Sequence, residues 1–203
     1  MFKKLKTYLN KKNLKDQKYN YLFEPYIGDE YVCFDCETTG LDTKKDEIIS
    51  IGAIIIKNNK ILHSKKFERF VKTTKPLTKE NITIHHIRQC DIKNAHNIDD
   101  VIVEFINFVG NRPLVGYYLE FDVAMINRYL KPQFGIKLPN KQFEVSGLYY
   151  DMMIKKYPNG NIDLRFDTIM NKLSLPRLAK HDAINDVIMT AMIFVKLMFK
   201  KES

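Results

Sequence analysis

Short apolar runs separated by turn signals fill the first third of the chain. One run, residues 31–34, is broken by Gly40, and a second run, residues 47–56, is rich in isoleucine. A third run, residues 61–71, follows a polar segment, residues 57–60, that has the composition of a hairpin turn. Because strands joined by short turns pair side by side, this pattern predicts an antiparallel meander of three strands.

Apolar residues at a spacing of three and four replace this pattern further along the chain. Residues 72–97 are rich in loop signals, and residues 99–109 carry an apolar stripe that Asp99 and Asp100 are expected to cap. Residues 112–118 are expected to contain a short buried strand. Four more helices are predicted, over residues 121–130, 148–156, 164–173 and 182–200, the first of them stopped by Pro132.

The chain has 203 residues, which suits one domain with a single hydrophobic core. Its 33 basic residues outnumber its 24 acidic residues, and the net charge is +9. A surplus of this size favours a polyanionic partner such as nucleic acid, although a lysine-rich solvated surface gives the same number. We therefore expect an α/β domain over residues 30–203, preceded by a basic and helical leader over residues 1–29.

The leader holds seven lysines and one aspartate in its first twenty residues, with Phe2, Leu5 and Leu9 at helical spacing. It is expected to dock on the domain, to contact nucleic acid, to lie on an acidic membrane surface, or to remain a solvated helix. No apolar run has the length of a signal peptide or a membrane span. We therefore expect a soluble, cytoplasmic protein.

Three cysteines, Cys33, Cys36 and Cys90, form an odd set without a disulfide framework, which is typical of a reducing compartment. Cys33 and Cys36 are three residues apart in a predicted strand, so their side chains point to opposite faces. A shared zinc or redox site is therefore not expected from this pair.

Four carboxylates and one histidine occur where predicted core elements begin or end. Asp35 and Glu37 follow the first strand and point to one face, Asp122 starts a helix, Asp186 lies one turn inside the last helix, and His181 precedes it. Each has an ordinary alternative as a cap, a surface acid or a core histidine. Together, hard oxygen ligands suit Mg²⁺ or Mn²⁺, and four carboxylates can hold two such ions for phosphodiester cleavage. A histidine can then accept a proton from water near neutral pH.

The same residues carry a resemblance to a known family. Residues 34–41, Phe-Asp-Cys-Glu-Thr-Thr-Gly-Leu, resemble the first motif of the DEDDh 3'-to-5' exonucleases, which include the proofreading epsilon subunit of bacterial DNA polymerase III. Residues 114–122 resemble the second motif, and residues 181–186 resemble the third, with its His-x4-Asp spacing. The resemblance covers about residues 30–198. It implies that residues 30–203 form a DEDDh exonuclease domain.

By that resemblance, the ligands of two divalent metal ions, Mg²⁺ or Mn²⁺, are Asp35, Glu37, Asp122 and Asp186. His181 is implied as the general base. Positions that hold the 3'-terminal nucleotide are matched by Thr38, Thr39, Leu41 and His85, although His85 and His86 also have the alternative of ordinary loop histidines.

One departure from the family pattern affects the second motif. Tyr117 and Tyr118 stand where the family usually has His-Asn. Tyr118 is expected either to stack on a base or to pack against the neighbouring helix. The departure leaves Asp122 in place and concerns local contacts with the substrate.

The resemblance implies a ribonuclease H-like α/β fold, a mixed five-stranded sheet with its first three strands antiparallel and helices on its flanks. It implies a two-metal-ion 3'-to-5' exonuclease that acts on DNA 3' ends in proofreading or repair and releases nucleoside 5'-monophosphates. Single-stranded DNA ends are the favoured partners, and a DNA polymerase is a further candidate. An exoribonuclease that trims RNA 3' ends, and a nucleic-acid-binding module without catalysis, are the alternatives.

Overall fold

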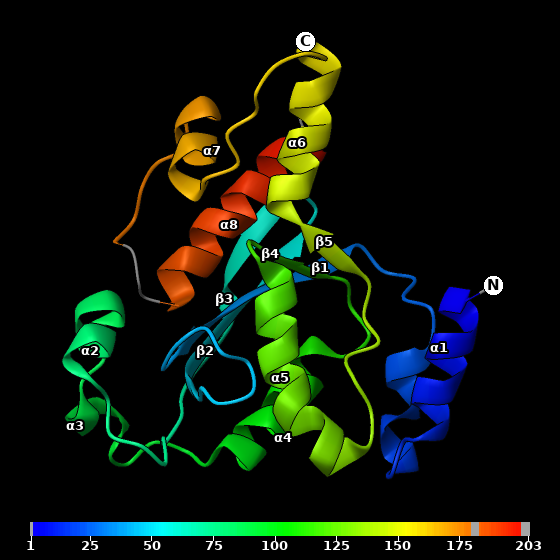
Figure 1. Cartoon of the computed structure of the whole chain (residues 1–203). Helices are drawn as coiled ribbons and strands as arrows, with labels where there is room; N and C mark the ends of the chain where they lie inside the picture. The colour runs from blue at the N-terminus through cyan, green and yellow to red at the C-terminus, as the bar shows by residue number, and fades with distance from the viewer. Residues whose placement is uncertain (1, 180–182, 200–203) are drawn as a thin grey trace.

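The centre of the chain is a five-stranded mixed sheet (Figure 1). In this computed structural model, which describes residues 2–179 and 183–199, the strand order is β3-β2-β1-β4-β5. The first three strands pair antiparallel, and β4 and β5 join them in parallel. The strands are β1 Glu30–Thr38, β2 Ile48–Lys57, β3 Lys60–Phe70, β4 Leu114–Gly116 and β5 Gln142–Glu144. The predicted sheet and its antiparallel first half are confirmed.

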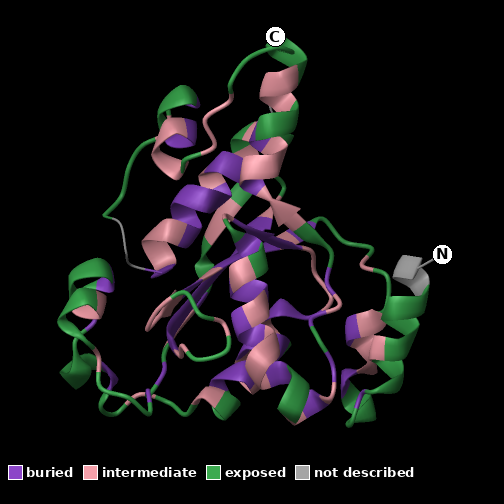
Figure 2. Cartoon of the chain, in the orientation of Figure 1, coloured by how far each residue is buried: buried purple, intermediate pink, exposed green. Residues whose placement is uncertain are grey.

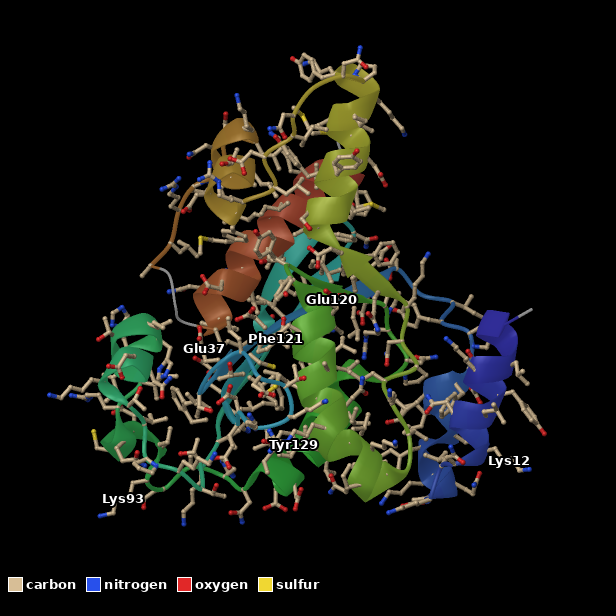
Figure 3. All side chains as sticks on the ribbon, viewed as in Figure 1. Lys12, Glu37, Lys93, Glu120, Phe121 and Tyr129 are labelled. Atoms are coloured by element: carbon tan, nitrogen blue, oxygen red, sulfur yellow. The ribbon has the colours of Figure 1, made fainter. Side chains whose placement is uncertain are left out.

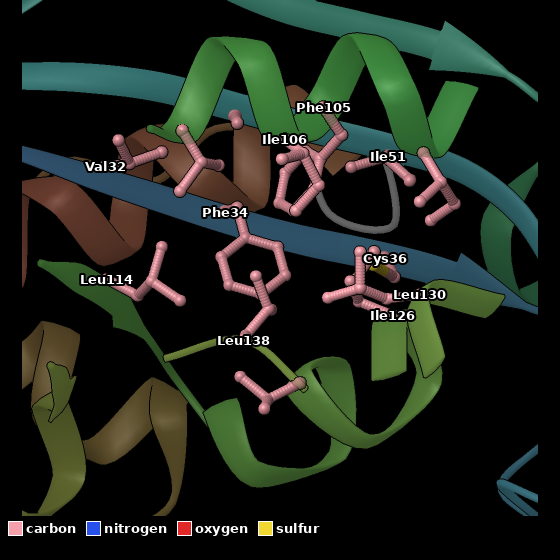
Figure 4. Close-up of a cluster of buried hydrophobic side chains, with 14 of the residues drawn as sticks. Val32, Phe34, Cys36, Ile51, Phe105, Ile106, Leu114, Ile126, Leu130 and Leu138 are labelled. Carbon is pink, nitrogen blue, oxygen red and sulfur yellow. The ribbon is translucent and has the colours of Figure 1, made fainter. Parts of the chain in front are cut away.

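Helices cover both faces of this sheet, as Figure 1 shows. On one face, α4 Ile98–Val109 and α5 Leu119–Phe134 pack around Phe34 of β1 (Figure 4). On the other face lie α6 Val145–Lys156, α7 Phe166–Lys172 and α8 Ala183–Met198. Cys36 belongs to the first core cluster and Cys33 to the second, so the predicted separation of the two thiols is confirmed. All three cysteines are free.

The leader forms helix α1, Phe2–Lys12, and the short 3-10 helix η1, Gln17–Phe23. The segment between these helices and η1 itself contact the carboxyl end of α5: the backbone N–H of Lys15 donates to the carbonyl of Phe134 (3.0 Å), and the rings of Tyr19 and Phe134 pack edge to face (4.7 Å between centroids). The boundary at residue 29 stays a prediction. Across the part of the chain described, the helices are too short or too polar to cross a membrane.

Helix α5 differs from the prediction at both ends. It begins at Leu119, two residues earlier than expected, and Pro132 lies inside it without stopping it. Proline removes a backbone donor, which costs stability, but the helix needs only two more residues to bury Phe134 beside Tyr19. The helix ends at Gly135, whose positive φ of 79° suits a residue without a side chain.

Residues 72–97, expected to be rich in loops, contain two short helices, α2 Lys79–His85 and α3 Gln89–Ile92. Thr78 and Asn81 form a reciprocal capping box at the start of α2, a local signal that the loop assignment overlooked. The prediction for α4 was wrong in its cap: Asn97 precedes the helix, and Asp99 and Asp100 lie in its first turn without capping it. Their charges there favour the helix dipole.

The remaining boundaries shift by a few residues. The strand expected within residues 112–118 is reduced to Leu114–Gly116, and β5, with three residues, was not located in the sequence because it is too short to show a period. Helix α6 starts three residues earlier than expected, and α7 is shorter by two residues at its start and one at its end.

One buried carboxylate joins the start of β1 to its neighbours, and its removal is expected to destabilise the fold. The side chain of Glu30 is 11% exposed and accepts from Arg112 Nε (2.7 Å) and Lys57 Nζ (3.2 Å). Hydrogen bonds from Arg112 are the main cause that lowers its pKa. We expect Glu30→Gln to lower the free energy of unfolding by about 2 kcal/mol. This loss is smaller than the loss expected on breaking a fully buried ion pair, because the side chains of Arg112 and Lys57 are partly exposed.

The test is urea denaturation of Glu30→Gln, with the exposed Glu24→Gln as the control. Because the folded-state pKa of Glu30 is lowered, its contribution is present above about pH 4.3, the usual value for Glu, and is lost as the pH falls through the folded value. The stability difference between wild type and variant should therefore shrink below about pH 4.3. A difference that is constant with pH would contradict this role for the charge.

Candidate active site

Three of the predicted ligands meet at the carboxyl end of β1. One carboxylate oxygen each from Asp35, Glu37 and Asp186 lies within 4.8 Å of the other two. Asp35 and Glu37 share a face of β1 because they are two residues apart in a strand. Asp186 comes from the first turn of α8, which packs on β1 and β2. In Figure 3, Glu37 is labelled beside the amino-terminal end of α8.

A glycine on β2 permits this close approach of α8. Gly52 pairs with Asp35 across the two strands. A Cβ atom at Gly52 would lie 2.7 Å from the backbone carbon of Ala183 and 2.8 Å from its oxygen, closer than van der Waals contact allows. The first turn of α8 therefore rests directly on the backbone of the sheet, one turn before Asp186.

Asp122 lies at the same strand end, in the first turn of α5. It is 3% exposed, and its Oδ1 accepts a hydrogen bond from the backbone N–H of Cys36 (3.2 Å). Because β4 ends at Gly116, this carboxylate satisfies a strand donor that lies beyond the parallel pairing. Asp122 is next to the group of three and not part of it: of the residues described, only Asp35, Glu37 and Asp186 meet the 4.8 Å distance.

Burial and then the crowding of negative charge raise the pKa values of Asp35 and Asp122. Burial raises the pKa of Asp35 well above its ordinary value, and the charges of Glu37 and then Asp186 raise it further. Burial also raises the pKa of Asp122, followed by the charge of Asp35, while the hydrogen bond from Cys36 acts in the opposite direction. Four like charges at one strand end therefore oppose folding unless a cation neutralises them.

The donor set fits a hard divalent cation. Every group in the cluster is a carboxylate oxygen donor, the class that Mg²⁺ and Mn²⁺ prefer. Burial raises the pKa of the nearby thiols of Cys33 and Cys36, so neither readily supplies the thiolate of a zinc site. The residues that would hold the cation are Asp35, Glu37 and Asp186, with Asp122 beside them.

The loop after β1 presents the predicted substrate residues in a fixed shape. Thr38 Oγ1 donates to the carbonyl of Gly40 (2.8 Å), and Thr39 Oγ1 donates to Asp46 Oδ1 (3.1 Å). Asn81 of α2 donates to the carbonyl of Thr39 (2.8 Å), so α2 is tied to this loop. In the same loop, Leu41 is 80% exposed, so its apolar side chain is accessible to a ligand.

His85 and His86 have different environments. His85 ends α2, is 3% exposed, and accepts at Nδ1 a hydrogen bond from the backbone N–H of Ile87 (3.1 Å). His86 is exposed and takes a left-handed backbone conformation with φ 57°. Both line a cavity of about 600 Å³ that reaches Ala183 and Asn185 at the start of α8. The cavity therefore reaches the first turn of α8, the turn that carries Asp186.

Tyr117 and Tyr118 point in different directions. The hydroxyl of Tyr117 donates to the carbonyl of Leu164 (3.1 Å), and its ring packs against Phe166, so this side chain holds the segment before α7. Tyr118 has a left-handed backbone (φ 60°), is 60% exposed, and lies parallel to the ring of Phe121 (6.2 Å, 16°). Tyr118 thus contacts the first turn of α5 while most of its ring faces solvent.

His181 lies outside the described residues, so its role as the general base stays a prediction. It precedes Ala183, where the described part of α8 begins, by two positions in the sequence.

Glu144, a further acid that the sequence reasoning missed, connects the two helices that start beside the site. Its Oε2 accepts from the backbone N–H of Leu119 at the start of α5 (2.8 Å), and its Oε1 accepts from the N–H of Ser146 in the first turn of α6 (3.1 Å). Its negative charge also contributes to the raised pKa of Asp122. The available signal was an acid at the end of a strand and the start of a helix, the pattern that identified Asp122.

Comparison with known proteins gives a consistent family. The exonuclease family RNase_T matches residues 32–194. Relatives include the PolC-type DNA polymerase III of Caldanaerobacter subterraneus subsp. tengcongensis, 33% identical over 181 residues, and that of Clostridium perfringens, 33% identical over 180 residues. These alignments cover 87% and 88% of this chain and 12% of each relative, so the chain spans a small part of the length of the proteins it matches.

Solved structures with the same fold have lower sequence identity. Cell-death related nuclease 4 superposes with a TM-score of 0.73 at 19% identity, over 84% of this chain and 64% of that one. Exonuclease X, solved with 5' overhanging duplex DNA, has a TM-score of 0.62 at 20% identity, over 83% of this chain and 90% of that one. The ribonuclease H-like fold is therefore confirmed. Since the family match spans most of β1, the acidic cluster and most of α8, the chain belongs to the DnaQ-like 3'-to-5' exonuclease family.

Proposed function

We propose that this chain is a metal-dependent 3'-to-5' exonuclease that releases nucleoside 5'-monophosphates. The observation that carries the proposal is the convergence of Asp35, Glu37 and Asp186 within 4.8 Å in a member of an exonuclease family. A purely binding module has no need for such a cluster, because half-buried carboxylates that repel one another destabilise a fold that binds no cation.

Each acidic residue has a role in this proposal. Asp35, Glu37, Asp122 and Asp186 would hold two Mg²⁺ or Mn²⁺ ions. Bound divalent ions would neutralise the scissile phosphate and lower the pKa of the attacking water. His181 accepts the proton of that water, for which an imidazole with a pKa of about 6.5 is suited near neutral pH.

The residues around the cluster grip the 3'-terminal nucleotide. Thr38 and Thr39 belong to a loop that internal hydrogen bonds hold in shape, which limits the entropy lost when substrate binds. The exposed Leu41 inserts beside the terminal base, and His85 lies against the terminal nucleotide. Tyr118, with Phe121 beneath its ring, offers an aromatic face to a base.

DNA is the proposed substrate, in proofreading or repair in the cytoplasm, with a DNA polymerase as a candidate partner. The relatives named above are DNA polymerases, and structural neighbours were solved with a dT13 oligonucleotide and with 5' overhanging duplex DNA. The net charge of +9 is favourable for a polyanion.

The test is a panel of 5'-labelled oligonucleotides with single-stranded DNA, mismatched duplex and RNA 3' ends, in Mg²⁺, Mn²⁺ or a chelator. We expect DNA to shorten by one nucleotide at a time from its 3' end only when metal is present. His181→Ala should bind the same ends and cleave about 10²- to 10⁴-fold more slowly. Faster shortening of RNA would change the substrate class, and internal cuts in an oligonucleotide with a blocked 3' end would contradict the exonuclease reaction.

A further inference from the structure

Helix α1 carries three large apolar side chains that are exposed. Leu5, Tyr8 and Leu9 are 54%, 64% and 50% exposed. Their spacing of three and four residues places them on one face of the helix. Three large apolar residues gathered on one exposed helix face are uncommon on a surface without a partner. In Figure 2 the outer side of this helix is coloured as exposed.

The opposite face of α1 attaches to the domain through polar groups. The side chain of Asn10 donates to the carbonyl of Lys137 (2.8 Å) and accepts from its backbone N–H (2.9 Å). Thr7 lines a cavity of about 240 Å³ shared with residues of η1 and the segment before β5. These contacts fix the orientation of the helix about its own axis. The apolar face therefore points outward because the opposite face is attached to the domain.

Lysines border this apolar face. At 100° per residue, Lys6 and Lys11 lie on opposite sides of the stripe formed by Leu5, Tyr8 and Leu9, and both lysines are exposed. The first twenty residues hold seven lysines and one aspartate. An apolar face with cations along its borders matches the interface of an anionic lipid layer, where the apolar groups enter the acyl boundary and the lysines remain among the headgroups.

We propose that α1 binds the surface of an anionic phospholipid bilayer. A second copy of the chain is a less favourable partner for this face of α1, because two faces bordered by lysines would repel each other. Nucleic acid would pair with the lysines but would leave Leu5, Tyr8 and Leu9 in water, since a phosphate backbone offers no apolar surface.

The position of α1 allows lipid binding and the candidate active site to operate separately. The leader contacts the carboxyl end of α5 at Phe134, while Asp122 lies in the first turn of that helix. Asp122 and Phe134 are 12 residues apart in this helix, so they are separated by about 18 Å along its axis at about 1.5 Å per residue. In Figure 1, α1 lies at the right of the view, and α2 and the start of α8 lie at the left, with the sheet between them. This inference does not depend on the proposed nuclease activity.

The chain has no tryptophan, so one introduced tryptophan reports on its own surroundings. We would place it in Tyr8→Trp and, as the control, in Ile27→Trp, because Ile27 is 98% exposed and lies outside α1. With vesicles of equal phosphatidylglycerol and phosphatidylcholine, the emission of Tyr8→Trp should shift to the blue and that of Ile27→Trp should not. Vesicles of phosphatidylcholine alone should produce no shift.

Flotation of the full chain with the same vesicles measures binding without the reporter. Leu5→Ala/Leu9→Ala keeps every charge and should lower the fraction bound at least about tenfold, with melting temperature and nucleotide release unchanged. Equal binding by this double variant, or no flotation of the wild type at low salt, would overturn the proposal. So would a single-stranded oligonucleotide that changes the emission of Tyr8→Trp where anionic vesicles do not.

Discussion

Replacing Asp35 with asparagine is expected to abolish nucleotide release while raising the melting temperature of the metal-free protein. The variant keeps the size of the side chain but removes the carboxylate that crowds Glu37 and Asp186. The loss of one ligand should slow cleavage at least about 10³-fold, since metal ions supply several kcal/mol of charge stabilisation. Removing the repulsion should stabilise the metal-free fold by about 1 kcal/mol, or roughly 2 to 4 °C.

The pH dependence provides a second readout of the same substitution. Because burial raises the folded-state pKa of Asp35, the folded protein holds this proton more tightly than the unfolded chain does. Its contribution to the stability of the metal-free protein therefore decreases as the pH rises above about 3.9, the usual value for aspartate. Asp35→Asn should not lose stability in this way. The difference in the free energy of unfolding between the variant and wild type should therefore grow as the pH rises from about 4.

Melting curves with and without Mn²⁺ complete this experiment. The melting temperature of wild type should rise with millimolar Mn²⁺, and that of Asp35→Asn should rise much less, because a cation stabilises only the state that binds it. Asp151→Asn, at an exposed position on α6, is the matched control and should behave as wild type. Undiminished cleavage by Asp35→Asn, or a metal-free protein that is less stable than wild type, would contradict the assignment.

The parts of the site that depend on local geometry could be predicted from the sequence. Asp35 and Glu37 share a face because a strand has a period of two, and the same rule separates Cys33 from Cys36. The antiparallel meander followed from strands joined by a short turn and a loop. The contact between Asp186 and Asp35 could not be predicted from local spacing, because residues 151 positions apart come together only through the fold. The resemblance to a family was the basis for predicting that these two residues share a site.

The remaining features depend on tertiary contacts that leave little trace in the sequence. A strand of three residues such as β5 is too short to show a period, so Glu144 at its end could not be placed beside Leu119. Pro132 was given its usual meaning as a helix stop, but the packing of Phe134 against Tyr19 outweighs the missing hydrogen bond. The first error reflects a local signal that is missing, and the second reflects burial between distant segments that overrides a local preference.

Replacing Gly52 with alanine is expected to displace Asp186 and to slow nucleotide release about 100-fold. The new Cβ would lie 2.7 Å from the backbone of Ala183, and a backbone atom cannot rotate away as a side chain can. The first turn of α8 must therefore move away from the sheet, and Asp186 moves with it. Overpacking of this kind costs about 1 to 3 kcal/mol, which leaves a folded protein whose metal site has the wrong spacing.

Gly147→Ala is the matched control, because a Cβ there meets only Glu144 Cγ at 4.0 Å and lies inside α6. It should leave cleavage unchanged and add about 0.5 to 1 kcal/mol to stability, as alanine favours a helix over glycine. The two variants should be compared in cleavage rate and in the Mn²⁺-dependent rise of melting temperature, well below the melting temperature of each. If Gly52→Ala loses stability but keeps both the rate and the metal response, then Gly52 serves only packing. If both fall together, the contact between β2 and α8 sets the distance between the carboxylates.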